Sequence, residues 1–417
     1  TNAGNNASGA GISFAGTVTD EANGYDLTLN AGTGGAVMGS AADGAGAVTV
    51  ADLTLANAAS TSFRGHVQVN DLVTNANAYP VTLTGAANTF TAGVDFRNSG
   101  KVTLGDTTSD DFFFAGGLAV AGNPAMDLAG TFRSSGAALN FGTGAVLLRE
   151  NTSVDATNGG VSASGGDLTF GGTIDNEEAS ASRKTLTLDA GAGGTVTIGG
   201  TVGGTSGIGA FTVAAASQAD LAAIADAATI AVTADNSDLN AATYTATTGG
   251  ITFTGPVDLD AGAVTTAVDS SAGNGDIEFT STIDDAAGDT ALTLDAGTGA
   301  VTAGGTVGGT SGIGSFTVAA ASQADLAAIE DGATIAVTAD NIDLNAATYT
   351  ATTGGITFTG PVDLDAGAVT TAVDSAAGNG DIEFTSTIDD AASDTALTLD
   401  AGTGAVTTGG TVGGTSG

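Results

Sequence analysis

The sequence contains no cysteine and no tryptophan, and it has only four prolines and four tyrosines among its 417 residues. Without cysteine, the chain forms no disulfide, no Cys-ligated zinc site and no thiol-based catalytic centre. It has no run of about 18 apolar residues, so we expect no membrane-spanning helix. The first residues carry no basic or apolar segment typical of a signal peptide, and we expect the chain to be a fragment of a longer protein.

Basic residues are equally scarce, with seven Lys and Arg against 45 Asp and Glu, for a formal net charge of −38. Residues 185–417 contain no Lys or Arg at all. Phosphate backbones and anionic membranes are poor partners for such a chain, which excludes nucleic-acid binding. The acids of this half therefore repel one another unless ions from solution screen them. The seven bases are Arg64, Arg97, Lys101, Arg133, Arg149, Arg183 and Lys184.

Small residues make up much of what is present, including 67 glycines. The hydrophobic fraction of 42% is too high for simple disorder, which combines low hydrophobicity with high net charge. Much of that fraction is alanine, so the core is thin. Such a composition favours narrow stacked coils over one wide globular core.

A long internal repeat is the strongest signal in the chain. Residues 201–305 and 306–410 align without a gap and differ at only seven positions, among them Ser237, which becomes Ile342. A unique catalytic centre is normally needed once, whereas a shaft gains length with every copy. We divide the chain into divergent coils (1–200), copy 1 (201–305), copy 2 (306–410) and the start of a further copy (411–417), together one continuous rod.

A shorter motif recurs at spacings that are not multiples of 105. The segment Ile-Thr-Phe-Thr-Gly-Pro-Val-Asp at 251–258 resembles the one that starts at Ile277, within the same copy. The alternation of apolar residues and threonine has the period of two that is typical of strands with one buried face. Gly-rich turns such as 295–299 separate the strands, since glycine adopts the positive φ that a tight corner requires. We expect about four coils in each copy.

These patterns predict an all-β parallel β-helix, or β-solenoid, with one short helical insertion in each 105-residue repeat. The insertion is expected because 217–220 reads as a helix capping box and is followed by Leu221 and Ile224 at helical spacing; 322–329 repeats the pattern. The alternative fold is a string of Ig-like β-sandwiches, which have about 100 residues each. Sandwiches account for the 105-residue period but not for the off-period motifs.

Acidic clusters in the turns are the only candidates for a ligand site. Calcium takes six to eight oxygen ligands, and no base competes for these carboxylates. The alternative is that they are solvated turn acids that confer solubility. No cofactor is otherwise required. The calcium candidates are Asp276, Glu278, Asp284, Asp285, Asp289, Asp381, Glu383, Asp389, Asp390 and Asp394.

Segments 251–257 and 292–301 resemble the giant β-strand-repeat and filamentous-haemagglutinin-like surface proteins of Gram-negative bacteria. The resemblance implies a right-handed parallel β-helix that is exported by an autotransporter, two-partner or type I route and lies at the bacterial cell surface. It also implies a role in adhesion or biofilm formation.

Three functions are compatible with these features. We expect a non-enzymatic extracellular shaft of a bacterial surface adhesin; the alternative is a subunit of a self-assembling filament or surface layer. The least favoured is a polysaccharide-acting β-helix enzyme, which needs paired carboxylates in a groove that usually also holds bases or aromatic platforms. The expected partners are further copies of the chain, end to end or side by side, or a ligand on a host or matrix surface.

Overall fold

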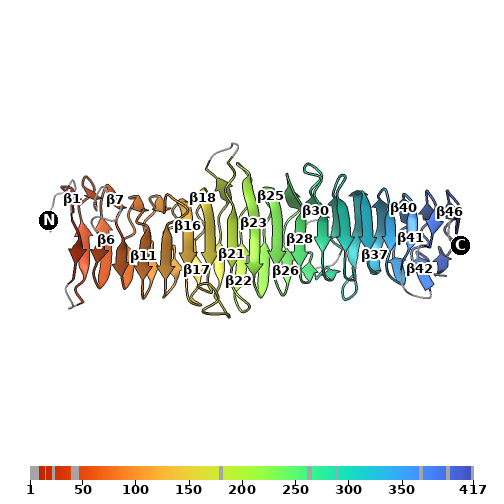
Figure 1. The fold of residues 1–417 in the computed structure, drawn as a ribbon, viewed down its shortest axis with the longest axis horizontal. Helices are drawn as coiled ribbons and strands as arrows, with labels where there is room; N and C mark the ends of the chain where they lie inside the picture. The colour runs from red at the N-terminus through yellow and green to blue at the C-terminus, as the bar shows by residue number, and fades with distance from the viewer. Residues whose placement is uncertain are drawn as a thin grey trace. The chain divides into compact units, whose positions relative to one another are not determined.

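The structure is a computed structural model that describes residues 9–14, 16–20, 24–38, 47–177, 182–260, 265–286, 289–365, 370–390 and 395–414. The chain divides into two units, Thr1–Gln218 (unit 1) and Ala219–Gly417 (unit 2). In both units the described residues form strands, turns and loops and no helix. Figure 1 shows the strands of each unit side by side, with the chain advancing one coil at a time.

Unit 1 is a parallel β-solenoid with three strands in each coil, and hence three faces. Its long strands β16 and β18 bend through a corner and belong to two faces. The first face contains β1 (Ile12–Ser13), β4 (Ala36–Met38), β7 (Ser60–Phe63), β10 (Val81–Leu83), β13 (Val102–Leu104), β16 (Met126–Arg133), β18 (Val146–Asp155) and β20 (Ile174–Asn176).

The second and third faces of unit 1 are built in the same way. The second contains β2 (Val18–Thr19), β5 (Val48–Thr49), β8 (Val67–Val69), β11 (Ala87–Phe90), β14 (Asp111–Phe114), the ends of β16 and β18, β21 (Leu186–Asp189) and β23 (Ile208–Ala215). The third contains β3 (Leu27–Asn30), β6 (Asp52–Asn57), β9 (Asp71–Thr74), β12 (Val94–Asp95), β15 (Leu118–Ala119), β17 (Leu139–Asn140), β19 (Leu168–Phe170) and β22 (Thr195–Ile198).

Unit 2 is also a three-sided parallel β-solenoid, and its faces are called A, B and C in the order in which the chain visits them. Face A contains the end of β25 (Ile224–Thr233), β28 (Ile251–Thr254), β31 (Ile277–Phe279), β34 (Ala300–Ala303), β36 (Gln323–Leu326), β38 (Ile342–Leu344), β41 (Val362–Leu364) and β44 (Ile388–Asp389).

Faces B and C complete each coil of unit 2. Face B contains β24 (Gln218–Leu221), β26 (Ser237–Leu239), β29 (Val257–Asp258), β32 (Ile283–Asp284), the start of β37 (Ile329–Thr338), β39 (Thr348–Ala351), β42 (Thr370–Asp374) and β45 (Ala396–Asp400). Face C contains the start of β25, β27 (Thr243–Ala246), β30 (Thr265–Asp269), β33 (Ala291–Asp295), β35 (Ile313–Ala320), the end of β37, β40 (Ile356–Thr359), β43 (Ile382–Phe384) and β46 (Val406–Thr408).

The short recurring motif is the strand of one coil, as its off-period spacing predicts. Ile251 of β28 pairs in parallel register with Ile277 of β31, and Phe253 pairs with Phe279. The backbone N–H of Ile251 donates to the carbonyl of Asp276 at 2.8 Å, which joins the two coils. Coil length varies, since the step from Ala324 to its register partner Ile342 is shorter than the step from Ile251 to Ile277. The parallel pairing excludes Ig-like sandwiches, whose sheets are antiparallel.

The core is a column of inward side chains that stack from coil to coil. The rings of Phe253 and Phe279 stack with centroids 5.2 Å apart. The buried Tyr349 donates its hydroxyl proton to the Leu326 carbonyl at 2.7 Å, so its polar end is satisfied inside the core. Because each face contributes only alternate residues, small apolar side chains suffice to fill the interior, and the alanine-rich composition is explained.

Aspartate and glycine form the corners. Asp295 accepts a hydrogen bond from the backbone N–H of Gly297 at 3.0 Å, an Asx turn, and Gly297 has a φ of 61°. Asp400 and Gly402 repeat this geometry at 3.0 Å in copy 2. Many of the acids of the repeat therefore serve to turn the backbone, a structural role that the turn prediction at 295–299 anticipated.

The predicted helical insertions are wrong. Residues 218–221 and 323–326 are the strands β24 and β36. In β36, Ala324 and Leu326 point into the core whereas Gln323 and Asp325 point outward, which is a period of two. Helix formation has a costly nucleus and a single turn is marginal in water, whereas the neighbouring coils offer backbone partners: the N–H of Ala324 donates to the Asn341 carbonyl at 3.0 Å.

Candidate functional site

The most distinctive surface feature of unit 2 is a pair of aspartate ladders. In each ladder, four aspartates at outward positions of neighbouring strands stack in parallel register. The face A ladder lies in copy 2 and consists of Asp325, Asp343, Asp363 and Asp389. The face B ladder lies in copy 1 and consists of Asp220, Asp238, Asp258 and Asp284.

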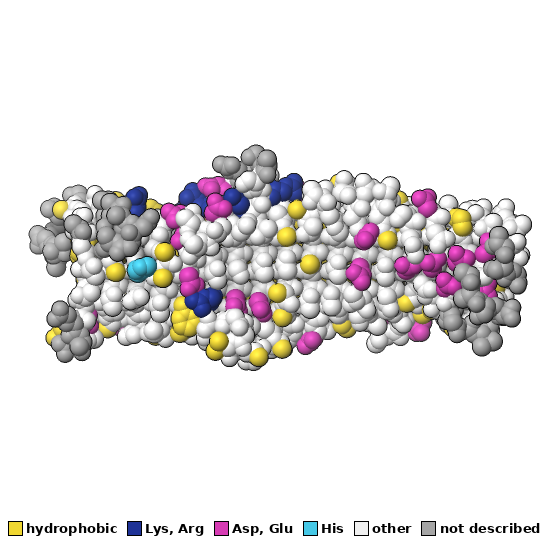
Figure 2. Space-filling view, in the orientation of Figure 1, with side chains coloured by type: hydrophobic (Ala, Val, Ile, Leu, Met, Phe, Trp, Pro, Cys, Tyr) yellow, Lys and Arg dark blue, Asp and Glu magenta, His cyan; other side chains and the backbone are white. Residues whose placement is uncertain are grey.

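The alternation of each strand forces these carboxylates outward. Asp343 lies between the buried Ile342 and Leu344, and the other ladder positions except Asp389 are likewise flanked by two buried residues; Asp389 follows the buried Ile388. Strands are about 4.8 Å apart, so neighbouring charges about 5 Å apart repel by roughly 1 kcal/mol in water and 3 kcal/mol at an effective dielectric constant of 20. Figure 2 shows Asp and Glu side chains gathering in a line toward the C-terminal end of the chain, without Lys or Arg beside them.

Amide side chains take the place that bases would normally occupy. Gln323 donates through Nε2 to Oδ1 of Asp325 and to Oδ2 of Asp343, at 2.8 Å in both cases. Asn341 donates through Nδ2 to Oδ1 of Asp343. A neutral amide satisfies the oxygen lone pairs without cancelling the charge, so the repulsion within the ladder remains.

The repulsion and the partial burial of the ladder change its protonation. Burial, together with the carboxylates of Asp325 and Asp363, raises the pKa of Asp343 to about 6. Burial also raises the pKa of Asp363 and that of Asp258 on face B, and the neighbouring carboxylates add to the rise. Asp343 therefore binds a proton at a pH at which an ordinary surface aspartate is ionised.

This shift predicts that acidification stabilises unit 2. The pKa of Asp343 rises from 3.8 to about 6 on folding, so its stabilisation is complete below about 3.8 and is lost as the pH rises through about 6. Because the Asp343 side chain is partly exposed, solvent screening reduces the effect to about 1 kcal/mol. Thermal melts followed by circular dichroism at pH 4.5 and 7.5 should show that Asp343→Asn raises the melting temperature at pH 7.5 and raises it much less at pH 4.5.

The exposed Glu383 of face C supplies the control for this prediction. Glu383→Gln removes one negative charge from the same unit but none from a ladder. An equal gain in melting temperature from both variants at pH 7.5 would show that net charge, and not the stacking of Asp343, limits stability.

The calcium candidates of copy 1 mostly serve as hydrogen-bond acceptors between or within coils. Asp276 accepts from the N–H of Ala300 in the next coil at 2.8 Å, and Asp284 accepts from the N–H groups of Thr310 and Ser311 at 2.8 and 3.2 Å. The buried Asp285 accepts from the N–H of Thr290 within its own turn. The two remaining candidates, Asp289 and Glu278, are exposed.

Copy 2 repeats this arrangement. Asp381 accepts from the N–H of Ala405 at 2.7 Å, Asp389 from that of Gly414 at 3.0 Å, and Asp390 from that of Thr395 at 2.6 Å. Glu383 is exposed, and Asp394 lies outside the described residues. Within the part of the chain that the structure describes, no three or more Asp, Glu or His side chains are grouped to hold a metal ion.

Several acids of unit 1 form ion pairs, because this unit contains all the Lys and Arg residues of the chain. The buried Asp127 lies between Lys101, at 2.5 Å, and Arg149, at 2.8 Å. Arg149 also contacts Glu177 at 2.7 Å, and Lys184 contacts Glu150 at 2.9 Å. The charge of these acids in unit 1 is thus compensated locally, whereas unit 2, which holds the two ladders, contains no Lys or Arg.

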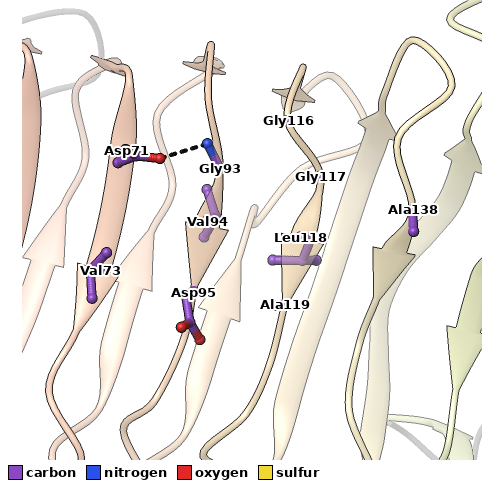
Figure 3. Close-up of a pocket in the computed structure, with 10 residues that line it drawn as sticks. All are labelled: Asp71, Val73, Gly93, Val94, Asp95, Gly116, Gly117, Leu118, Ala119 and Ala138. Atoms are coloured by element: carbon purple, nitrogen blue, oxygen red, sulfur yellow. Dashed lines mark hydrogen bonds between the residues drawn. The ribbon is translucent and has the colours of Figure 1, made fainter.

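The grooves on the two units are shallow. One, of about 310 Å³, crosses the third face of unit 1 over β9, β12 and β15 and reaches Ala138, just before β17 (Figure 3). The Asp71 carboxylate at its edge points to the N–H of Gly93 and accepts from it at 2.8 Å, and Asp95 is paired with Arg97 at 2.6 Å. A second groove, of about 460 Å³, is lined by small residues and Asp340 at a corner of unit 2.

His66, the single histidine of the chain, and the run Phe112–Phe114 have structural contacts. Nδ1 of His66 accepts from the N–H of Ala87 at 3.1 Å, which joins two coils. Phe112 and Phe114 are buried in the core, as a core-filling strand requires, and Phe113 points outward beneath the guanidinium of Arg133, 5.5 Å from its ring centroid.

Sequence reasoning found the individual acids but missed the ladders, which need the register of each coil. The sequence does contain a signal for the ladders. In each of the segments 219–221, 237–239 and 257–259, an aspartate lies between two residues that face inward, and these segments are about one coil apart.

No family model, curated protein or solved structure matches this chain. Among the described residues, no helix is long and apolar enough to cross a membrane.

Proposed function

We propose that this chain is a segment of the shaft of an extracellular bacterial surface protein, with a structural and adhesive role and no enzymatic one. The proposal is carried by the junction between the two copies. Leu292 of copy 1 pairs in register with Phe316 of copy 2, and Val301 pairs with Ala324. A tandem copy thus extends the same solenoid without a linker, so duplication lengthens the fold.

The surface of the repeat is consistent with this role. Its acids act as corner turns, as hydrogen-bond acceptors between coils and as outward ladders, all of which recur in the second copy. The high negative charge keeps such a repetitive protein soluble and counters aggregation between exposed strand edges. The ligand of an adhesin would lie on a host or matrix surface.

The alternative is a filament or surface-layer subunit, in which the end of one solenoid pairs with the next molecule. Electron microscopy of the purified chain, with and without millimolar calcium, separates the two functions. Single particles of one length support the shaft. Fibres or lattices that grow with protein concentration would refute it and establish self-assembly as the function; growth only with calcium would add a metal to that assembly.

A deletion of residues 306–410 provides a matched variant. It joins 305 to 411 and restores the sequence of the copy junction. A shaft shortens by roughly 20 Å, at about 4.8 Å for each coil, and keeps its melting behaviour. Small-angle scattering measures the change in length. Release of reducing ends from an acidic polysaccharide by the full chain, but not by a variant lacking the ladder aspartates, would instead establish an enzyme.

A further inference from the structure

The two copies of the repeat do not present the same face of the solenoid. Ile251 belongs to face A, where it pairs with Ile277, whereas its copy-2 counterpart Ile356 belongs to face C, where it pairs with Ile335. Ala219 belongs to face B, and its counterpart Ala324 belongs to face A. Every inward position of copy 1 in unit 2 moves by one face in this way.

The shift follows from the number of strand positions in one copy. From Ile251 to the residue before Ile356 the chain visits fourteen positions: the strands β28 to β36, β38 and β39, the bridge residue Val307, and the two halves of β37. Three positions complete a coil, so fourteen make four full coils and two further faces. The sequence expectation of about four coils missed this fraction, because coil length changes within the copy.

We infer that the 105-residue repeat is a screw operation of four and two-thirds coils, so that each added copy displays its surface on a different face and three copies restore the original direction. A change in copy number by one therefore turns everything beyond it by a third of a turn. A flat partner along one side of the array meets the same repeat surface only once in three copies.

This rotation has an electrostatic consequence for the ladders. In each copy, four of the four and two-thirds coils carry a ladder aspartate, so a ladder extends along nearly the whole copy. A repeat of whole coils would place the ladders of all copies on one face, as an almost continuous row of carboxylates. The extra two faces move the ladder from face B in copy 1 to face A in copy 2, so neighbouring copies do not extend each other's repulsion.

The inference is testable with cysteine pairs, because the chain contains no cysteine. Thr302 of copy 1 and Asp325 of copy 2 are register partners at outward positions of neighbouring coils on face A. Adjacent strands bring their Cα atoms to about 5 Å, within the range of a disulfide. Oxidation of the variant Thr302→Cys/Asp325→Cys should crosslink most of the protein, seen as a faster band on non-reducing gels and as the loss of two hydrogens by mass spectrometry.

Two further pairs decide the outcome. Asp343→Cys/Asp363→Cys has the same geometry within one copy and is the positive control. Asp284→Cys/Asp325→Cys joins faces B and A and should not crosslink, whereas a repeat of four whole coils would make these residues neighbours. Failure of the Thr302/Asp325 pair while the control pair forms overturns the inference. If oxidation fails throughout, spin labels at the same cysteines decide: a distance at the Thr302/Asp325 pair as short as the control supports it, and a longer one overturns it.

Discussion

Replacing Phe279 with alanine is expected to destabilise unit 2 by about 3–5 kcal/mol, the usual result of removing a buried phenylalanine. Its ring is fully buried and stacks on Phe253 at 5.2 Å. On the other side its register partner is Ala303, whose methyl group is too small to fill the space. Parallel pairing holds β31 in register with β28 and β34 on either side, so the coils cannot close the cavity without breaking that register, and we expect little relaxation.

Urea unfolding followed by circular dichroism measures this loss, and Glu278→Ala is the matched control. Glu278 precedes Phe279 in β31 and is exposed on the outer side of the same strand. Its replacement should change the free energy of unfolding by less than about 0.5 kcal/mol. A loss below about 1 kcal/mol for Phe279→Ala, well under the usual range, would mean that the stacked rings do not hold neighbouring coils together.

Replacing Gly380 with alanine is expected to cost about 1–3 kcal/mol, because two coils approach backbone to backbone at this corner. A Cβ atom at Gly380 would lie 2.1 Å from the carbonyl oxygen of Gly354 in the preceding coil. Gly404 approaches Gly380 in the same way, at 2.4 Å, so glycines are stacked along this corner. An added methyl group must push two coils apart. This separation weakens the backbone hydrogen bonds between the strands of these coils.

The same substitution at Gly332 is not expected to lower the stability of the chain. A Cβ atom at Gly332 would have its nearest neighbour 3.6 Å away, and copy 1 carries the buried Ala227 at the equivalent position. Gly332→Ala should therefore be neutral or stabilise the chain by up to about 1 kcal/mol, since alanine restricts the unfolded backbone. Thermal melts of both variants test the pair; equal effects would contradict the close packing of coils at Gly380.

Local patterns predicted the strands and corners well. The alternation in Ile251-Thr-Phe253 and its recurrence from Ile277 indicated stacked strands, and the structure pairs these segments in register. The same reasoning failed at 217–224 and 322–329. There the residue types satisfy both a capping box and a period of two, and the choice between helix and strand depends on the backbone partners that neighbouring coils supply.

For the acids, too, the sequence shows some features, and only the structure shows the others. Their turn positions were evident, and so was the absence of any base after Lys184. Grouping them by sequence distance placed Asp284, Asp285 and Asp289 in one cluster, but Asp284 points outward in the ladder, Asp285 is buried, and Asp289 is exposed with a φ of 73°. Side chains that are adjacent in sequence point to different sides, whereas aspartates a whole coil apart stack on one another.

By itself, then, the sequence determined that this chain is a repetitive β-solenoid with glycine corners and an acidic surface, because strand periodicity, turn chemistry and duplication are local properties. The tertiary structure alone decided which residues lie above one another. Coil lengths that differ from one coil to the next set the register. The register in turn creates the aspartate ladders and the rotation of one copy against the next, since neither depends on distance along the chain but on the number of strands between two residues.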